Sequence, residues 1–252
     1  MTLGRKFSEK AGDKNVGVIK KILAASLGTV MFAAAAVMGY YAYMGYNMYS
    51  IAASEKSVSE MAADIRGRCD FIEYDELPVF YEEAVIASED KNFFEHGGID
   101  ISAICRAVLH DIKVKAPEQG GSTITQQLAK NEYFTQEKHL ERKFAEIFMA
   151  FRIEKELSKE EIFALYVNSI YFGSGYYGVE SAAEGYFGKR VSELTEYECA
   201  MLAGLPNAPS AYSPDVSPEL AEKRTERVIE NMTRENYISD EKAESLMCRE
   251  TQ

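Results

Sequence analysis

Tryptophan is absent from this 252-residue chain, and histidine, cysteine and proline are sparse, with three, four and six residues. The histidines, at positions 96, 110 and 139, show none of the short spacings, such as H-E-x-x-H, by which zinc enzymes bind their metal. The cysteines, at positions 69, 105, 199 and 248, include no C-x-x-C pair. The sequence therefore predicts no zinc site built from protein ligands alone.

Charged residues are missing from Ile22 to Ser54, and the first part of this stretch is almost wholly apolar or small. A bilayer core about 30 Å thick needs roughly 20 such residues in a helix. We therefore predict a transmembrane helix over residues 22–46. A cleaved signal peptide would have a shorter apolar region, and a buried helical hairpin in a soluble core is the remaining alternative.

The residues on either side of this segment predict its orientation. Six basic residues precede it, at positions 5, 6, 10, 14, 20 and 21, against only Glu9 and Asp13. By the positive-inside rule, residues 1–21 form a cytoplasmic tail and the chain from about residue 50 onward is exported. Tyrosines at positions 40, 41, 43, 46 and 49 are typical of an interfacial aromatic belt. We predict a stalk over residues 47–75 and a folded domain over 76–250.

Without that tail, 22 basic and 38 acidic residues give the remaining chain a net charge of −16. So acidic a body is a poor binder of nucleic acid, which needs a basic surface. An anionic ligand must instead meet a local basic cluster. Export would permit disulfides in any of three pairings, although Cys105 and Cys199 lie in apolar helical patterns typical of core residues.

Helix signals follow one another through the exported part, and strand alternation is scarce, so a mainly α-helical domain is expected. Three kinds of signal mark the expected helix starts. Prolines suit the first turn at positions 78 and 218, and Asp100 and Ser122 are candidate caps. Capping boxes are formed by Ser158 with Glu161 and by Thr195 with Glu198.

Polar residues crowd two of the helix boundaries. In "SEDKNFFEHGGID", residues 88–100, the adjacent acids Glu89 and Asp90 are followed by His96 and two glycines. Taken alone, this stretch is typical of a solvated helix end. In "GGSTITQQLAKN", hydroxyls and amides surround a helix start, where free N–H groups favour anions and sugar hydroxyls find hydrogen-bond partners.

A long helix over about 137–157 places Arg142, Lys143 and Glu146 within one third of its circumference. The opposite side carries an apolar stripe that we expect to face the core: Leu140, Phe144, Ile147, Phe148 and Phe151. An ordinary surface ion pair is the alternative interpretation of the charged residues.

Together the motifs resemble a known family. "EDKNFFEHGGID", "GGSTITQQLAKN", "RKFAE", "IFALYVNSIYFGSGYYGVESAAEGYFGK" and "LTEYECAMLAGLPNAPSAYSP" occur in the order found in family 51 of the glycosyltransferases, the peptidoglycan glycosyltransferases. The resemblance covers roughly residues 70–240. It departs from the family pattern only slightly, with Ser217 and Val167 where Asn and Leu are usual.

The resemblance implies a lysozyme-like, two-lobed helical domain outside the bacterial cytoplasmic membrane, with an apolar lobe that dips into the bilayer. It also implies polymerisation of lipid II into a growing glycan strand, with release of undecaprenyl pyrophosphate. Other cell-wall synthesis or division proteins are candidate partners. Because the chain ends at Gln252, a monofunctional enzyme without a transpeptidase domain is expected.

The resemblance assigns roles to individual residues. Glu89 matches the general base that deprotonates the acceptor hydroxyl. Lys130, Arg142 and Lys143 match cations around the phosphates, and Glu146 matches the glutamate that orients these cations or holds a divalent cation, Mg²⁺ or Mn²⁺. No cofactor is expected to be obligatory.

Further residues are expected to shape the site. Candidates for substrate or loop contacts are Ser122, Thr123, Gln126, Gln127 and Asn131. Supporting roles are expected for Asp90, Phe93, His96, Gly98, Asn168, Tyr171 and Arg224.

Four alternatives remain at this point. His96 is a competing base, and Ser122 is a weaker candidate nucleophile because no histidine–acid pair is recognisable near it. A glycan-cleaving enzyme shares the helical fold and a key glutamate. A catalytically silent membrane scaffold is the rival from another class.

Overall fold

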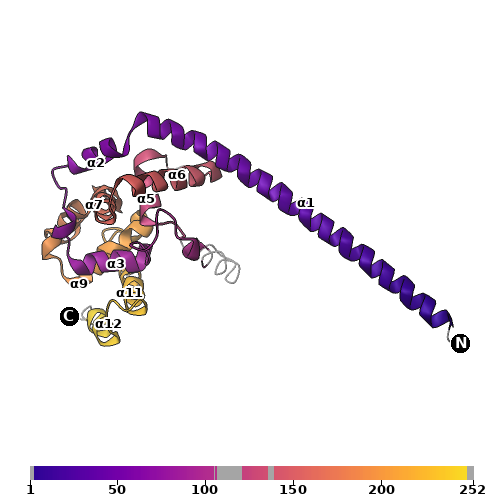
Figure 1. The fold of residues 1–252 in the computed structure, drawn as a ribbon. Coiled ribbons are helices and arrows are strands. Elements are labelled where there is room, and N and C mark those ends of the chain that lie inside the picture. The colour runs from indigo at the N-terminus through magenta and orange to yellow at the C-terminus, as the bar shows by residue number, and fades with distance from the viewer. Residues whose placement is uncertain (1–2, 105, 107–120, 136–138, 249–252) are drawn as a thin grey trace.

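The computed structural model describes residues 3–104, 106, 121–135 and 139–248, with side chains from residue 25 onward. One long helix extends from a compact helical body (Figure 1). The α-helices are α1 Leu3–Glu55, α2 Val58–Arg66, α3 Val79–Glu89, α5 Ile124–Tyr133, α6 Leu140–Glu156, α7 Lys159–Ser169, α8 Val179–Phe187, α9 Glu196–Gly204, α10 Pro209–Tyr212, α11 Pro218–Arg234 and α12 Asp240–Met247.

The other elements are short. Among the described residues, three 3₁₀ turns cover Tyr74–Glu76, Val191–Glu193 and Leu205–Asn207. Strands β1 Tyr171–Gly173 and β2 Tyr176–Tyr177 pair as a small antiparallel hairpin and are the only sheet in the described part of the chain. The mainly α-helical class predicted from the sequence is thus confirmed.

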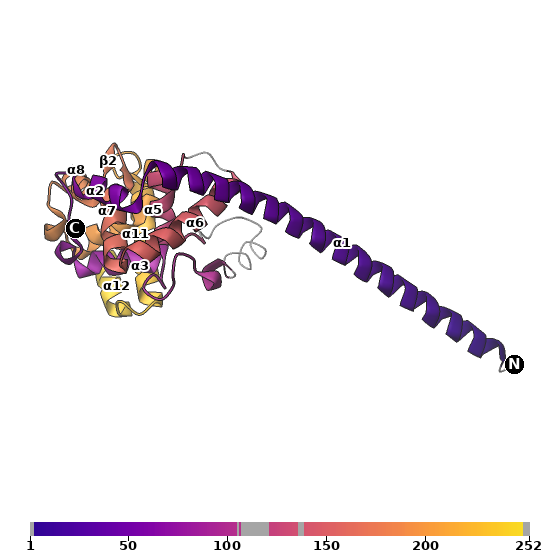
Figure 2. The ribbon, with the colours of Figure 1, turned by 45° about the horizontal axis from the view of Figure 1, so that its top comes forward.

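Helix α1 extends away from the body, and its N-terminal end lies far from every other element (Figures 1 and 2). Its segment Ala25–Glu55 is long and apolar enough to cross a membrane. The large apolar side chains of this segment, such as Phe32 and Val37, are exposed. A bilayer would cover surface that no protein element covers.

The core of the body is built around α7, which is buried along its whole length from Ile162 to Ser169. A helix that is apolar on all sides needs neighbours on all sides. Helix α7 packs against α2, α5, α6 and α8, and a second group, α3, α9 and α11, packs together beside it. Helix α5 therefore lies between α6 and α7, where its polar start can meet residues from both.

Local sequence signals explain most of the helix boundaries. The capping boxes at Ser158 and Thr195 form as predicted, and α11 begins at Pro218. The predicted cap at Ser122 is wrong by one residue. Thr123 caps α5 and forms a capping box with Gln126, which leaves the Ser122 side chain available for another contact.

The predicted stalk also needs correction. Helix α1 continues unbroken to Glu55, and α2 then buries Val58, Met61, Ala62 and Ile65 in the core. The folded body thus begins near residue 58 instead of residue 76. The polar composition of residues 50–75 hid this, because α2 is amphipathic and exposes its other face.

Candidate active site

Glu89 is the last residue of α3, and both of its carboxylate oxygens have a partner. Gln127 Nε2 donates to Oε2 at 2.9 Å, and Arg224 Nη2 lies 3.3 Å from Oε1. The side chain is 8% exposed. Residues from α5 and α11, separated by almost a hundred positions, therefore fix the orientation of one acid at the end of α3.

These partners are themselves held in place. The hydroxyl of Tyr166 on α7 donates to Gln127 Oε1 at 3.1 Å, which directs the amide nitrogen toward Glu89. Burial, and then the charge of Glu89, raise the pKa of Tyr166 well above its usual value, so this hydroxyl remains a donor. Arg224 Nε donates to Gly204 O at 3.0 Å.

Asp90 joins the first motif to the start of α5. One carboxylate oxygen lies 2.8 Å from His96 Nε2, and the other accepts the backbone N–H of Ile124 at 3.0 Å. Asp90 and His96 are nearly buried, with side chains 4% and 10% exposed. The pair links the first motif to α5, and its supporting role stays a prediction.

Gly98 completes this support. Its φ of +84° is a left-handed conformation that glycine adopts readily, and a Cβ there would lie 3.2 Å from Phe151 Cδ1 on α6. Its carbonyl accepts a hydrogen bond from Thr123 Oγ1 at 2.8 Å. Phe93 is fully buried and packs against Phe163 of α7. The first motif is thus anchored to α5, α6 and α7 at once.

Helix α6 lies in the opposite rotation to the one predicted. Its buried residues are Ala145, Glu146, Met149, Ala150 and Ile153. Within the apolar stripe expected to face the core, Leu140 and Phe151 are 58% and 44% exposed, and Phe148 packs on Tyr46 and Tyr49 of α1. The stripe faces α1 and the surface, because the second apolar partner is the long helix.

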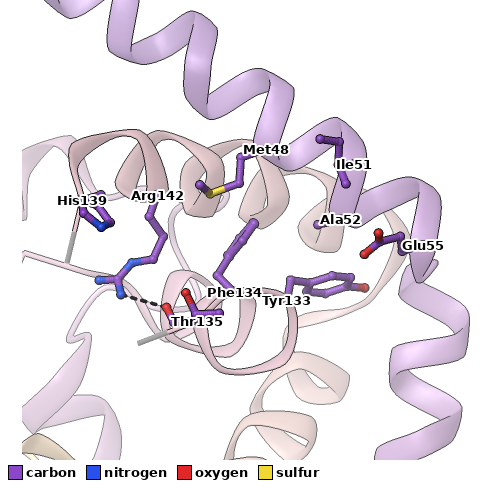
Figure 3. A pocket seen from close by; sticks show the side chains of 9 residues that line it. All are labelled: Met48, Ile51, Ala52, Glu55, Tyr133, Phe134, Thr135, His139 and Arg142. Carbon is purple, nitrogen blue, oxygen red and sulfur yellow. Dashed lines mark hydrogen bonds between the residues drawn. The ribbon is translucent and has the colours of Figure 1, made fainter. Parts of the chain in front are cut away.

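Glu146 is therefore a buried acid, 3% exposed in its side chain, held between two cations. Lys143 Nζ donates to Oε2 at 3.0 Å. Arg142 Nε lies 2.9 Å from Oε1 as an ion pair, although neither atom makes a hydrogen bond. Arg142 Nη1 donates to the carbonyl of Thr135 at 3.0 Å (Figure 3). The surface-pair interpretation does not fit this burial.

Lys143 connects this cluster to the second motif. Its Nζ donates to Ser122 Oγ at 2.7 Å and to Gln126 Oε1 at 3.1 Å, as well as to Glu146. The hydroxyl and amide groups predicted for substrate contact thus also order the cation. Ser122 has a lysine as its neighbour, in keeping with the weak case for a serine nucleophile.

The charge of Lys130 on α5 interacts with both carboxylates. Burial is the main cause that lowers the pKa of Lys130. The negative charges of Glu146 and Glu89 raise this pKa, whereas the positive charges of Arg142 and Lys143 lower it further. None of the residues that the structure describes makes a hydrogen bond or ion pair with its ammonium group. Among the described residues, Lys130 is thus a partly buried cation without an anionic partner, within electrostatic reach of both Glu89 and Glu146.

The remaining predicted residues divide into bracing and peripheral positions. Asn168 is buried and hydrogen-bonds both the N–H and the C=O of Ile72, at 2.9 and 2.8 Å, so it ties the segment after α2 to α7. Tyr171 stacks on Tyr177 across the hairpin, with ring centroids 4.8 Å apart. Asn131 follows Lys130 on α5 and is half-buried.

A divalent metal fits poorly at Glu146. The described residues contain no group of three or more acidic, histidine or cysteine side chains that could hold one. Both oxygens of Glu146 face cations instead. A metal ion there would be a third positive group and would face repulsion without further carboxylates to balance it.

Two supporting residues were not assigned from the sequence. Tyr166 orients Gln127, and its only sequence signal was its place in the quoted "IFALYVN" segment. Gly45 of α1 approaches α6 so closely that a Cβ would lie 2.6 Å from Glu141 O. Nothing in the sequence distinguishes Gly45 from Gly39, which has no atom within 4 Å of such a Cβ.

Comparison with known proteins defines the class. The model of the transglycosylase family matches residues 54–233, and this chain belongs to that family. Penicillin-binding protein 1A of Neisseria flavescens is 45% identical over 183 residues, which are 73% of this chain and 23% of that protein. Penicillin-binding protein 1A of Aquifex aeolicus is 48% identical over 177 residues, 70% of this chain and 24% of that protein.

The chain thus spans about a quarter of the length of these curated relatives. Among solved structures, penicillin-binding protein 1A from Haemophilus influenzae is 35% identical; the match covers 49% of this chain and 15% of that one, with a TM-score of 0.35. The family match confirms the resemblance inferred from the motifs and the lysozyme-like helical class that it implied.

Proposed function

We propose that this protein polymerises lipid II, a disaccharide-pentapeptide on undecaprenyl pyrophosphate, into β-1,4-linked glycan strands at the outer face of the cytoplasmic membrane. Membership of the transglycosylase family supports this proposal. The observation that carries it is that α5 connects an oriented acid to a cationic cluster: Gln127 donates to Glu89 at 2.9 Å, and Gln126 accepts at 3.1 Å from Lys143, the partner of Glu146. An acid for proton removal and a cationic site for a leaving phosphate thus contact the same helix.

Glu89 accepts the proton of the acceptor sugar's 4-hydroxyl as that oxygen attacks C1 of the donor. A positioned carboxylate contributes about 10² to 10⁴ in rate to such a step. Gln127 and Arg224 restrict the orientation of the carboxylate before substrate binds. Attack from the side opposite the pyrophosphate inverts the configuration at C1.

Lys130, Arg142 and Lys143 compensate the negative charge that develops on the departing pyrophosphate. Glu146 holds Arg142 and Lys143 in position without neutralising Lys130 through a direct ion pair. We assign this step to the chain's own cations and place no metal in it.

The apolar segment Ala25–Glu55 anchors the domain beside its lipid-linked substrate. We place the basic tail in the cytoplasm and the body outside, by the positive-inside rule. A monofunctional enzyme stays a prediction, and labelling with a fluorescent penicillin tests it, since an enzyme without a transpeptidase site forms no covalent adduct.

A glycan-cleaving enzyme is the nearest rival. Glycoside hydrolysis uses an acid to protonate a sugar oxygen and has no pyrophosphate to neutralise, so the cationic cluster favours synthesis. The test is to incubate the full-length protein in liposomes with lipid II and, separately, with finished glycan strands. We expect polymer from lipid II and unchanged strands; shortened strands without growth from lipid II would overturn the proposal.

A further inference from the structure

A second nearly buried acid lies on α6, about two turns after Glu146. The Glu154 side chain is 11% exposed, and its Oε1 accepts two short hydrogen bonds. The donors are Thr125 Oγ1 at 2.5 Å, from the first turn of α5, and Lys159 Nζ at 2.7 Å, from the first turn of α7. One carboxylate oxygen thus joins three helices, and none of these three residues belongs to the candidate active site.

Lys159 extends this network to the first motif. Its Nζ lies 4.4 Å from the centre of the Phe93 ring, a cation–π contact. Phe93 is fully buried and follows Glu89 by four residues. Lys159 therefore compensates the charge of Glu154 and at the same time contacts an aromatic ring of the motif that contains Glu89.

The hydrogen bond to Glu154 restricts the rotation of α5 about its own axis. Thr125 bonds Glu154, and the next residue, Gln126, accepts a hydrogen bond from Lys143 Nζ at 3.1 Å. Lys143 and Glu154 are 11 residues apart on α6, which is about 16 Å along the helix axis. Two adjacent side chains of α5 thus hold distant points of α6, and a rotation of α5 that kept one hydrogen bond would stretch the other.

The contact between α5 and Glu89 depends on this rotation. Gln127, the residue after Gln126, donates to Glu89 Oε2 at 2.9 Å. Side chains extend about 5 to 6 Å from a helix axis, so a rotation of about 20° would move the Gln127 amide by about 2 Å. Such a displacement breaks a hydrogen bond of this length. A misplacement of only about 1 Å can lower the rate of an enzyme about a hundredfold.

We propose that Glu154 and Lys159 are positioning residues that fix the rotation of α5 through Thr125. This rotation sets the contacts of α5 with Glu89 and with the cationic cluster around Glu146. The inference rests on the proposed function, in which neither positioning residue touches the reacting groups. A buried ion pair contributes little to stability by itself, because lost hydration offsets the attraction between its charges. The main effect of this pair is therefore on geometry.

The test compares lipid II turnover by full-length variants in liposomes. Thr125→Val removes the hydroxyl at a fully buried position. It should lower kcat at least about tenfold and change KM less than about threefold, because the misplaced groups act in the transition state. Thr125→Ser keeps the hydroxyl and should retain most of the activity. In the control Thr233→Val, the lost hydroxyl bonds Ile229 O within the same helix at 3.0 Å, and kcat should not change.

A second pair of variants tests the same link from α7, whether or not Thr125→Val folds. Lys159→Met keeps an apolar side chain beside Phe93 but removes the charge, and it should lower kcat; Lys159→Arg keeps the charge and should restore it. Each kcat is expressed per folded protein, with the folded fraction measured by circular dichroism. Unchanged kcat in Lys159→Met and in folded Thr125→Val would overturn the proposal. So would equal losses in the conservative variants.

Hydrogen exchange separates this inference from the proposed function. We expect the amides of α5 to exchange faster in Thr125→Val than in Thr125→Ser, whether or not the protein polymerises lipid II. Faster exchange without polymerisation by the native protein would contradict the proposed function and leave the positioning contact in place. Polymerisation at the same kcat in the native protein and in Thr125→Val would contradict the positioning role alone.

Discussion

Replacing Glu146 with glutamine should destabilise the body far more than the same change at a surface ion pair. Glu146 is 3% exposed and lies within 3.0 Å of cationic groups of both Arg142 and Lys143. Removing one member of a buried ion pair costs about 3 to 5 kcal/mol, because the remaining charge loses its compensation. Lys143 is 41% exposed and water can solvate it, so we expect the lower end, about 3 kcal/mol.

Helix α6 itself supplies the matched control. Glu156 pairs with Arg152 at 2.9 Å, also four residues apart, but these side chains are 38% and 32% exposed. An exposed pair of this kind contributes about 0.3 to 0.5 kcal/mol, so Glu156→Gln should be nearly neutral.

Thermal unfolding of the full-length variants in detergent, followed by circular dichroism, measures the difference. For a body of this size, a loss of about 3 kcal/mol lowers the midpoint by roughly 6 to 12 °C. Glu156→Gln should shift it by about 1 to 2 °C. If the two variants melt together, Glu146 does not organise a buried charge cluster, and its assigned role fails.

Three further outcomes follow. Burial lowers the pKa of Lys130, so kcat/KM should begin to fall at a lower alkaline pH than it would with an exposed lysine. In Lys130→Arg this fall should move to higher pH. A pH profile that does not move would contradict the assignment of Lys130 to the phosphate site. Burial raises the pKa of Cys199 to about 12, so a thiol reagent should label the exposed Cys69 in the native protein but reach Cys199 only after unfolding; rapid native labelling of Cys199 would contradict its burial. Chelation with EDTA should change lipid II turnover by less than about threefold, because both oxygens of Glu146 face cations; a complete loss restored by Mg²⁺ would show that a metal supplies charge that we assign to lysine and arginine.

The helical architecture could be predicted from local signals. Capping boxes at Ser158 and Thr195 and the proline at position 218 depend on contacts within one turn, and they begin helices where expected. The adjacency of Ser122 and Thr123 was ambiguous, because either hydroxyl has the chemistry of a cap. Only the path of the chain into α5 decides between them.

The rotation of α6 could not be predicted, because two apolar partners competed for it. Its aromatic stripe is the stronger sequence signal, but the stripe contacts α1, and the face with Glu146 turns inward. A buried carboxylate is favoured only where cations compensate it. Periodicity identified Arg142 and Lys143 as neighbours of Glu146 without revealing that the Glu146 carboxylate is buried.

The pairing of Glu89 with Arg224 joins residues 135 positions apart, and no local pattern predicts such a contact. The motif resemblance did bring both residues into the site, and the geometry adds Tyr166 as the group that orients Gln127. Helix α1 was predicted as an apolar span. The close approach of α1 to α6 at Gly45 requires that this residue has no side chain. A hydropathy profile does not reveal such a requirement.

The most direct test of the account is lipid II consumption by the full-length protein and its Glu89→Gln variant in liposomes. Glu95→Gln, a change at an exposed acid of the same motif, is the matched control. We expect glycan strands from the native protein and from Glu95→Gln, and a loss of at least about a hundredfold in Glu89→Gln, the scale of general-base catalysis. Equal polymerisation by Glu89→Gln would contradict the assignment of Glu89 as the base and would make His96 the next residue to replace.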